Sequence, residues 1–291
     1  MDLPIVVGVD GSEPSLRAVD WAADEAALHA APLRLVYASL WERYEGALIA
    51  QEVHRPAEEV MPRDVVGPAE QRARRRQPGV PVSTGVLAEE PEYGLVRESR
   101  TARALVVGCR GRSGLTEALL GSVGVTVAGH AHCPVIVVRG THDNRIHPGI
   151  RGRVVLGVDG KPAGSAAVRY AIEEAALRGV PLEAVRAWRR PAHTAGRHPL
   201  LSGEPGHFQE EDAAEAVEAA LRDAPEDLEV YRSVVEGQPR DALLAASHDA
   251  GLLVVGARRR SGLHFGLQLG RVAHGVLHHA ACPVAVVPEP A

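Results

Sequence analysis

The chain has 291 residues, of which 45% are hydrophobic, 24% are charged and 3% are aromatic, and its formal net charge at pH 7 is −5. This length suits one large domain or two domains of about 145 residues. The mildly acidic balance and the scarcity of aromatic side chains argue against a nucleic-acid-binding protein. Lys161 is the single lysine among 32 basic residues, and Pro162 follows it. The Gly-Lys-Ser/Thr ending of a P-loop is therefore absent, which excludes that class of nucleotide site.

The cysteines and the apolar segments limit the cellular compartment and the kinds of metal site that the sequence allows. Cys109, Cys133 and Cys282 are widely separated and form no Cys-x-x-Cys pair, which supports neither a disulfide framework nor a zinc site with paired thiolates. Residues 118–138 carry no Asp, Glu, Lys or Arg, but three glycines and Pro134 interrupt them, as expected for a helix followed by a strand rather than a membrane span. The N-terminus lacks the basic region of a signal peptide. We expect a cytoplasmic protein without a membrane segment.

The two halves of the chain repeat one another at an offset of 148 or 149 residues. The recurring segments are Val6–Gly11 with Val155–Gly160, Leu105–Gly108 with Leu253–Gly256, and Cys133–Val138 with Cys282–Val287. A polar run at 141–151 separates the halves. We therefore predict two copies of one domain, at residues 1–140 and 150–291.

Short apolar runs alternate with helical patterns along each half. Strands are predicted at 5–9, 33–37, 81–87, 104–107 and 135–138, and then at 153–158, 182–187, 228–234, 252–255 and 284–287. Ser12 is a good N-cap and Pro14 suits a first turn, so the first helix is predicted to begin after Ser12. Further helices are predicted around Pro68–Arg76, after a variable stretch at 40–67, then after Pro91 and near Ser122. This alternation predicts an α/β fold, in which a parallel sheet carries helices on both faces and binds ligands at the carboxyl ends of its strands.

Glycines and polar residues gather where two strands of the first half end and where the next helix begins. They are Asp10, Gly108, Gly111, Gly114, Gly121 and Ser122. Glycines leave backbone N–H groups uncovered, and a helix N-terminus adds further N–H groups and a positive dipole end, so a phosphate group is the expected ligand. Arg110 and Arg112 would supply the positive charge. Asp10 is placed to accept a hydrogen bond from a ribose hydroxyl or an adenine amine.

The sequence Gly108-x-x-Gly111, nine further residues and then Gly121-Ser122 resembles the nucleotide-binding motif of the universal stress protein family. Two such domains resemble its tandem members, which implies two Rossmann-like domains of the adenine nucleotide alpha hydrolase-like type, each with a five-stranded parallel sheet. In the ATP-binding branch, the resemblance implies that Gly8 and Asp10 lie by the nucleoside and that Val36 offers backbone to the adenine. The implied phosphate-binding residues are Gly108, Arg110, Gly111, Arg112, Ser113, Gly114, Gly121, Ser122 and Val123. A Mg²⁺ ion is expected with the triphosphate.

The second half departs from this motif. Arg259 stands at the second glycine, ten residues instead of nine precede Gly270, and Arg271 replaces the serine. Its candidate nucleotide-binding residues are Gly157, Asp159, Gly256, Arg258, Gly262 and Gly270. We expect the first half to bind ATP well, and the second half to bind it weakly, differently or not at all.

The remaining reactive residues are interpreted as structural, so no catalytic residue and no metal-binding side chain is predicted. Glu117 in the phosphate loop is interpreted as an exposed charge and the Arg72–Arg76 run as a solvated helix face. Cys109 is interpreted as a small filler, with redox sensing as the alternative. Five histidines are interpreted as helix C-terminal residues that interact with the helix dipole: His130, His132, His274, His278 and His279.

The leading hypothesis is therefore an ATP-binding regulatory protein of the stress response, in which nucleotide orders residues 108–123 for recognition by a protein partner still to be identified. A slow ATPase and a scaffold with a structural, non-exchanging nucleotide remain as alternatives. By the family pattern, the apolar edge strands at 135–138 and 284–287 are expected to pair with each other as an intrachain pseudo-dimer, because exposed strand edges need cover. Homodimerisation of the whole chain stays open.

Overall fold

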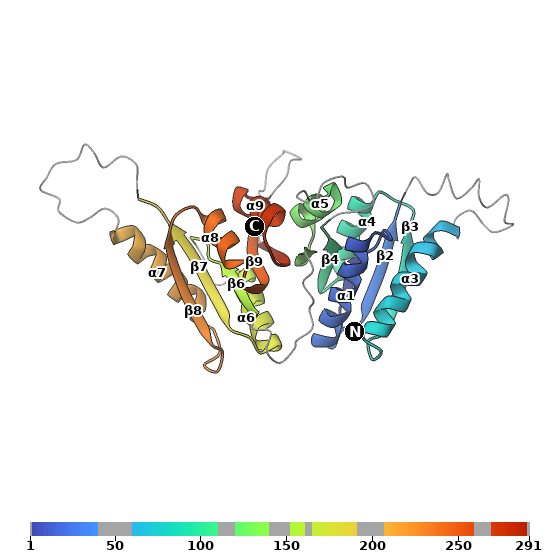
Figure 1. Ribbon diagram of the computed structural model, residues 1–291, viewed down its shortest axis with the longest axis horizontal. Helices are drawn as coiled ribbons and strands as arrows, with labels where there is room; N and C mark the ends of the chain where they lie inside the picture. Colours follow the sequence, from blue (N-terminus) through green and yellow to red (C-terminus); the bar gives the residue numbers. More distant parts are fainter. Residues whose placement is uncertain are drawn as a thin grey trace, which may run out of the picture.

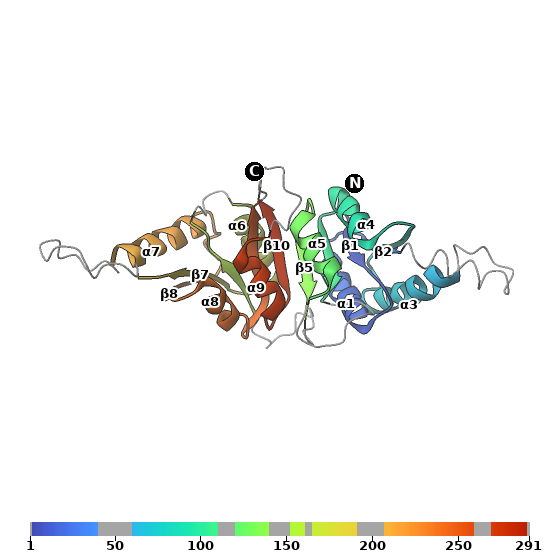
Figure 2. The same ribbon diagram turned by 90° about the horizontal axis from the view of Figure 1, so that it is seen from above.

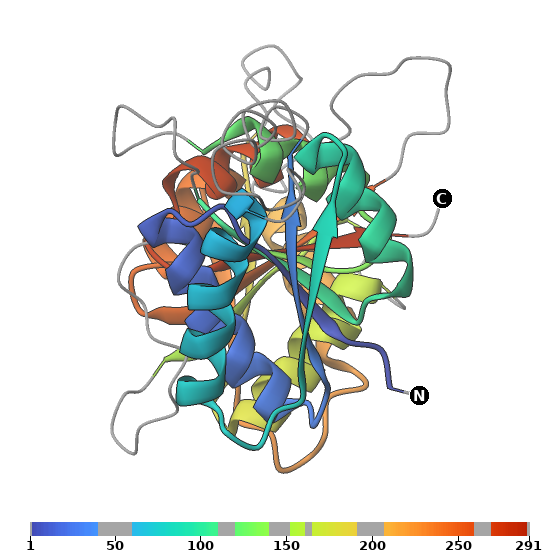
Figure 3. The same ribbon diagram turned by 90° about the vertical axis from the view of Figure 1, so that its right-hand side faces the viewer.

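The computed structural model describes residues 2–39, 60–109, 120–139, 152–160, 165–190, 207–258 and 269–289. They form an α/β protein with one continuous ten-stranded sheet, to which each half of the chain contributes five strands (Figure 1). Seen along the long axis of the molecule, the strands cross its middle and helices lie on both sides (Figure 3). Among the described helices, none combines the length and the hydrophobicity that a membrane span requires.

All ten predicted strands are present. They are β1 (Ile5–Gly8), β2 (Leu33–Ala38), β3 (Val82–Leu87), β4 (Ala104–Gly108), β5 (Val135–Val138), β6 (Arg153–Gly157), β7 (Leu182–Trp188), β8 (Val230–Glu236), β9 (Ala250–Arg258) and β10 (Val284–Glu289). Their order in the sheet is β3-β2-β1-β4-β5-β10-β9-β6-β7-β8. Neighbouring strands run parallel except β5 and β10. In each half the strand order reverses beside the first strand, which is the place where ligands bind in such sheets.

Two layers of helices cover the sheet. The helices are α1 (Glu13–Leu28), α3 (Val60–Arg76), α4 (Pro91–Glu98), α5 (Ser122–His130), α6 (Ala166–Arg178), α7 (His207–Leu221), α8 (Pro239–Ala246) and α9 (Arg271–His279). The buried side chains of α1, α3, α6 and α7 share one hydrophobic core with one face of the sheet. Those of α4, α5, α8 and α9 share a second core with the opposite face. Corresponding helices of the two halves therefore lie on the same face of the common sheet.

Helix α3 begins earlier than the sequence pattern suggested. Residues 60–67, which the sequence assigned to a variable stretch, belong to this helix, and Pro68 lies inside it. A proline within a helix removes one backbone hydrogen bond and is usually costly. Here Val65, Ala69 and Ala73, spaced four residues apart, are all buried in the core that α1 shares. Buried apolar residues lie on both sides of Pro68 along the same face, and their packing against α1 explains why the helix continues through the proline.

The arginines of α3 correct a second expectation, because this run is not simply a solvated face. Arg72 makes a two-point contact with Asp20 of α1, with N···O distances of 2.9 and 2.6 Å. Arg76 contacts Asp24 at 2.5–3.1 Å, and these two side chains are only 11% and 6% exposed. The two arginines lie one turn apart on α3, and the two aspartates lie one turn apart on α1. The two ion pairs therefore hold α3 and α1 side by side. Arg74 does face solvent and pairs with Glu70 one turn away.

The predicted pairing of the two edge strands is present and is antiparallel (Figure 2). Val135, Ile136 and Val137 of β5 lie opposite Val286, Ala285 and Val284 of β10. All six side chains are buried. Two apolar strand edges, each of which would be a site for unwanted pairing if exposed, thus become the centre of one sheet.

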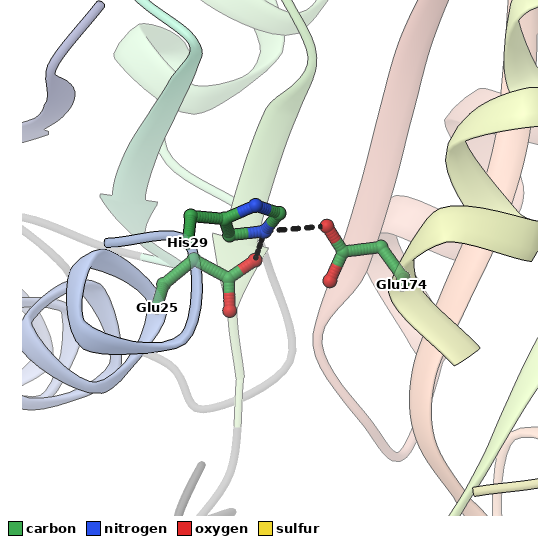
Figure 4. A group of neighbouring side chains, drawn as sticks. All are labelled: Glu25, His29 and Glu174. Atoms are coloured by element: carbon green, nitrogen blue, oxygen red, sulfur yellow. Dashed lines mark hydrogen bonds and ion pairs between the residues drawn. The ribbon is translucent and has the colours of Figure 1, made fainter. Parts of the chain in front are cut away.

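A second contact between the halves joins α1 to α6 through buried charges (Figure 4). His29 Nε2 lies 2.9 Å from Glu174 Oε1 and 3.5 Å from Glu25 Oε1. Arg178 Nη2 lies 2.5 Å from Glu25 Oε2 and 2.8 Å from Glu174 Oε2. Both glutamates are fully buried. The four residues form an interdomain charge cluster, in which each carboxylate contacts both a guanidinium and an imidazole.

The surroundings of this cluster favour a positive charge on His29. Burial by itself lowers the pKa of His29, but hydrogen bonds and charge from Glu174 and Glu25 outweigh it and raise the pKa to about 9. Arg103 acts in the opposite sense, because its Nε–H donates to His29 Nδ1 at 3.0 Å and a protonated imidazole could not accept that bond. Burial and the neighbouring carboxylates also raise the pKa of Tyr170, which faces the cluster from α6.

The raised pKa gives interdomain stability a defined pH dependence. Because the pKa of His29 is higher in the folded state than its ordinary 6.5, the stabilisation is complete below about pH 6.5 and is lost as pH rises toward 9. Burial likewise raises the pKa of Glu174, so the ionisation of this carboxyl group acts in the same direction.

We predict that the free energy of unfolding of the wild-type protein falls by about 1–3 kcal/mol between pH 6.5 and 9, and that His29→Gln lacks most of this fall. Urea unfolding across this pH range measures both. His130→Gln is the matched control, because His130 is exposed and contacts a carbonyl of its own helix. Parallel curves for the wild type and His29→Gln would contradict the prediction.

Candidate nucleotide site

A cavity of about 270 Å³ lies at the carboxyl ends of β1, β2 and β4. Every predicted site residue of the first half that the structure describes lines this cavity: Gly8, Asp10, Val36, Gly108, Gly121, Ser122 and Val123. The other lining residues are Val9, Ser15, Ala38, Pro91, Leu95, Val107 and Gly124. The structure thus brings together residues more than 100 positions apart, at the point where the strand order reverses.

Close packing explains two of the glycines in the cavity wall. A Cβ atom on Gly8 would lie 3.0 Å from a methyl group of Leu95 on α4. A Cβ atom on Gly108 would lie 2.7 Å from the carbonyl group of Pro14, in the first turn of α1. Any larger residue at 108 would therefore push α1 away from β4. Gly108 serves this helix–strand contact as well as leaving backbone exposed to the cavity.

A tight turn orients the carboxylate of Asp10. Its Oδ1 accepts hydrogen bonds from the backbone N–H of Ser12 at 3.0 Å and from the hydroxyl of Ser12 at 2.6 Å. Gly11 between them has a φ of +81°, a conformation that favours glycine. The Ser12 hydroxyl in turn accepts from the N–H of Ser15, which confirms the predicted N-cap of α1. The turn therefore fixes a negative charge at the cavity wall and starts the helix at the same time.

The N-terminus of α5 forms a further part of the cavity wall. Its N-cap residue, Gly121, provides no side-chain hydrogen bond to the first turn, and its own N–H donates to the carbonyl of Cys109 at 2.9 Å. The free N–H groups of an uncapped helix start suit an anion, as does the dipole. The hydroxyl of Ser122 donates to Glu92 of α4 at 3.3 Å, so one carboxylate also stands at this rim.

The apolar side of the cavity was not anticipated from sequence. Pro91 and Leu95 on α4 line it, together with Ala38 at the end of β2. The helix after Pro91 is predicted correctly, and Leu95 follows Pro91 at helical spacing on the same face. That spacing was a usable signal for an apolar wall, whereas the position of α4 over Gly8 depends on tertiary packing.

Several predicted residues lie outside the described part of the chain. In the first half these are Arg110, Gly111, Arg112, Ser113, Gly114 and Glu117. In the second half they are Arg259 and Gly262, together with the side chain of Arg258. The roles expected for these residues, including the phosphate contacts of the motif and the exposed position of Glu117, remain predictions.

The second half repeats part of the cavity wall. A Cβ atom on Gly157 would lie 3.1 Å from Leu243, as at Gly8 and Leu95. Asp159 accepts a hydrogen bond from the N–H of Gly160, and Gly270 is the N-cap of α9 as Gly121 is of α5.

The surroundings of Gly256 differ from those of Gly108. The carboxylate of Glu289, at the end of β10, accepts from the hydroxyl of Ser165 at 2.5 Å and from the N–H groups of Ala166 and Ala167 at 2.9 and 3.0 Å. It lies 3.2 Å from the position of a Cβ on Gly256. A side-chain carboxylate of the chain itself therefore caps α6, beside the glycine where the first half packs the backbone of α1. Sequence reasoning missed Glu289, because its partners are more than 120 residues away.

The histidines and cysteines have varied surroundings. His130 contacts the carbonyl of Thr126 at the end of its helix, as predicted. His278 lies in the last turn of α9, as predicted, and also reaches the other half, where its Nδ1 accepts from the N–H of Leu120 at 3.4 Å. Burial together with positive neighbours lowers the pKa of His278. Cys133 and Cys282 are buried, which raises the pKa of each thiol to about 12 and makes them poor nucleophiles.

Within the described residues, one group of side chains has metal-ligand geometry, namely Glu25, His29 and Glu174, whose ligand atoms lie within 4.8 Å of one another. Arg178 already contacts the second oxygen of both carboxylates. The group therefore has its own cation, and we describe it as the interdomain charge cluster rather than as a metal site.

Comparison with known proteins agrees with the internal repeat of the chain. The model of the universal stress protein family matches residues 3–139 and again residues 151–288. The chain belongs to the universal stress protein family. As two matches imply, it is a tandem member with two Rossmann-like domains.

Relatives of this universal stress protein extend over both halves. One from Mycolicibacterium smegmatis is 34% identical over 304 residues, which cover 97% of this chain and 96% of that one. The crystal structure of one from Archaeoglobus fulgidus shares the fold with a TM-score of 0.66 at 18% identity, over 98% of each chain. A universal stress protein solved in complex with cAMP is 30% identical, covers 47% of this chain and 96% of its own, and has a TM-score of 0.34.

The close approach at Gly108 can be tested by stability. We predict that Gly108→Ala lowers the free energy of unfolding by about 1–3 kcal/mol, because the added methyl group forces the first turn of α1 away from β4. Urea unfolding measures this change. Gly79→Ala is the control, because a Cβ there meets nothing within 4 Å. Equal stability of the two variants would rule out the tight contact.

Proposed function

We propose that this universal stress protein binds ATP in the cavity of its N-terminal half and that the bound nucleotide regulates its recognition by a protein partner. The observation that carries the proposal is the convergence on one cavity of Asp10, the glycine backbone at Gly108 and the uncapped start of α5. These features supply the chemistry that a nucleotide needs: a carboxylate for hydroxyl groups, close backbone approach, and N–H groups for phosphate.

The cavity offers a separate environment for each part of the nucleotide. Leu95 and Ala38 provide an apolar surface for the base. The carbonyl of Val36 already accepts from the N–H of Val9 at 2.9 Å, but a carbonyl oxygen has a second lone pair for an adenine amine. Asp10 would accept from the ribose, and the phosphates would extend toward Ser122 and the N-terminus of α5.

The residues present also fit a magnesium ion bound with the nucleotide. Mg²⁺ prefers oxygen ligands and usually combines phosphate oxygens with one or two protein groups. Asp10, Ser15 and Ser122 are the oxygen-bearing side chains in the described lining, and Asp10 and Ser122 would be the protein ligands. The ion would neutralise part of the phosphate charge and so reduce the repulsion between the phosphates and the carboxylate of Glu92 at the rim.

We propose regulation rather than efficient catalysis. Among the described residues that line the cavity, Asp10 is the one titratable side chain, and its Oδ1 is engaged by Ser12. A general base needs both an accessible atom and a matched pKa to activate water. The residues that line the cavity therefore support slow hydrolysis of ATP at most.

In the C-terminal half we propose weaker or different nucleotide binding. Arg271 replaces Ser122 at the start of the corresponding helix, and the carboxylate of Glu289 stands beside Gly256. Both changes alter the charge around the positions that would approach phosphate.

The charge of Asp10 gives the sharpest test. Asp10→Asn keeps an oxygen for the Ser12 turn but removes the negative charge, so we predict that ATP affinity falls about 10-fold or more, as for loss of one charge-assisted hydrogen bond. Isothermal titration calorimetry measures this affinity. The matched control is Asp159→Asn at the equivalent position of the second half, which should leave the tight site unchanged.

Stoichiometry decides between the halves. We expect one tight ATP site per chain, and mass spectrometry of freshly purified, denatured protein should show at most one tightly held nucleotide. Two equal sites, or unchanged affinity in Asp10→Asn, would overturn the proposal. Multiple turnovers at the rate of an ordinary ATPase would replace the regulatory function with an enzymatic one.

A further inference from the structure

A second cavity, of about 650 Å³, lies at the carboxyl edge of the C-terminal half. Its described lining residues are Arg189, Gln238, Pro239, Arg240, Arg271 and Val272. Arg189 directly follows β7, Arg240 lies in the first turn of α8, and Arg271 is the first residue of α9. Three guanidinium groups and no carboxylate therefore line this cavity among the described residues. We call it the arginine cleft.

The equivalent positions of the N-terminal half have the opposite charge. In the aligned repeats, Glu90, Glu92 and Ser122 correspond to Gln238, Arg240 and Arg271. The formal charge at these three positions changes from −2 to +2. In the first half, Ser122 and Glu92 bond to each other across the rim. In the second half, two arginines stand at the same two positions, so this pair has been replaced by groups that repel each other unless an anion lies between them.

The guanidinium groups of the cleft are available for a ligand. Arg189 and Arg271 are exposed, and neither forms an ion pair with a carboxylate of the described residues. Arg240 contacts its chain neighbour Asp241 at 3.1 Å, with 52% and 56% of the two side chains exposed. An exposed pair of this kind contributes little to stability, so phosphate can displace the carboxylate at low cost.

Packing holds Arg240 in position at the cleft. Its side-chain stem lies against Gly275 of α9, where a Cβ atom would come within 2.6 Å of Arg240 Cδ. The equivalent residue of the first half is Thr126. The glycine therefore makes room for this arginine, which loses less conformational freedom on binding than an unsupported surface side chain.

Two helix starts reinforce the positive potential. The N-cap residues Gln238 of α8 and Gly270 of α9 make no side-chain hydrogen bond to their helices. Helix α9 therefore presents the free N–H groups of its first turn next to Arg271. In α8, Pro239 has no N–H and the N–H of Asp241 donates to the carbonyl of Gln238, so this helix offers the N–H of Arg240 itself. Guanidinium groups bind phosphate through two parallel hydrogen bonds, which a lysine cannot provide.

We propose that the arginine cleft binds a multiply phosphorylated small molecule through its phosphate groups, without contributions from a nucleoside. Neither Asp159 nor Gly157, the residues placed to contact a nucleoside in this half, lines the cleft. The inference does not depend on ATP binding in the N-terminal half, because it concerns different residues in the other half.

The test uses inorganic tripolyphosphate as the probe and the full-length chain. The double variant R240E/R271S restores the two residues of the N-terminal half at exposed positions. We expect calorimetry to show tripolyphosphate binding to the wild-type protein, with affinity that falls as salt concentration rises, and at least a 10-fold weaker affinity in the double variant. Arg232→Glu is the control, because Arg232 is exposed on β8, pairs with Glu218 and lies outside the cleft; its affinity should equal that of the wild type.

Further arms separate this site from the nucleotide cavity. Asp10→Asn should weaken ATP binding in the first half and leave the affinity of the cleft for tripolyphosphate unchanged. Adenosine should fail to compete with tripolyphosphate. Wild-type affinity in R240E/R271S would place the phosphate elsewhere and overturn the proposal, and competition by adenosine would overturn its restriction to phosphate groups.

Discussion

The antiparallel pairing of β5 with β10 is the contact on which the rest of the architecture depends. It joins two apolar strand edges at the centre of one sheet and leaves β3 and β8, whose side chains are exposed or half-buried, at the outer edges. Because the two halves meet through the same strand of the repeat, their helices fall into common layers, with α1 and α6 on one face and α5 and α9 on the other. The charge cluster around His29 and the bond from Leu120 to His278 exist only because this pairing brings those helices together.

This arrangement separates the residues that hold the molecule together from the residues that line its cavities. The strand pairing uses apolar side chains that point into the cores, whereas both cavities lie at the carboxyl ends of strands, away from the pairing. The two cavities could therefore diverge without loss of the fold. In one half, glycines and an uncapped helix surround Asp10; in the other, Glu289 caps the first helix and arginines replace Glu92 and Ser122. Duplication preserved the scaffold and freed one copy of the site to change.

Sequence reasoning succeeded where a local pattern, the repeat, the family resemblance or the rule for parallel sheets applies, and it failed for individual side-chain pairs between distant helices. The strands, the N-cap at Ser12 and the grouping of Asp10 with Gly108 and Gly121 follow from local pattern, the repeat and the rule for parallel sheets. The pairing of Arg76 with Asp24 spans 52 residues, and that of His29 with Glu174 spans 145. A run of arginines looks solvated until the helix with the matching acids is placed beside it. For the same reason, α3 continues through Pro68 because its apolar stripe has a partner in α1.

Helix α1 connects the nucleotide cavity to the contact between the halves. Its first turn is capped by Ser12, which holds Asp10, and packs on Gly108; its last turn carries Glu25, and His29 follows as its C-cap. Sixteen residues of helix span about 24 Å, and Arg72 and Arg76 brace this helix along its length through Asp20 and Asp24. A ligand that moves the turn at Asp10 therefore also acts on helix α1, which the ion pairs with α3 hold in place. The other end of α1 carries the buried charges that it shares with α6. Buried charges tolerate displacement poorly, since a shift of either partner leaves a carboxylate without its cation. Under the proposed function, a change in the relative position of α1 and α6 is the physical link between the bound nucleotide and recognition by a partner.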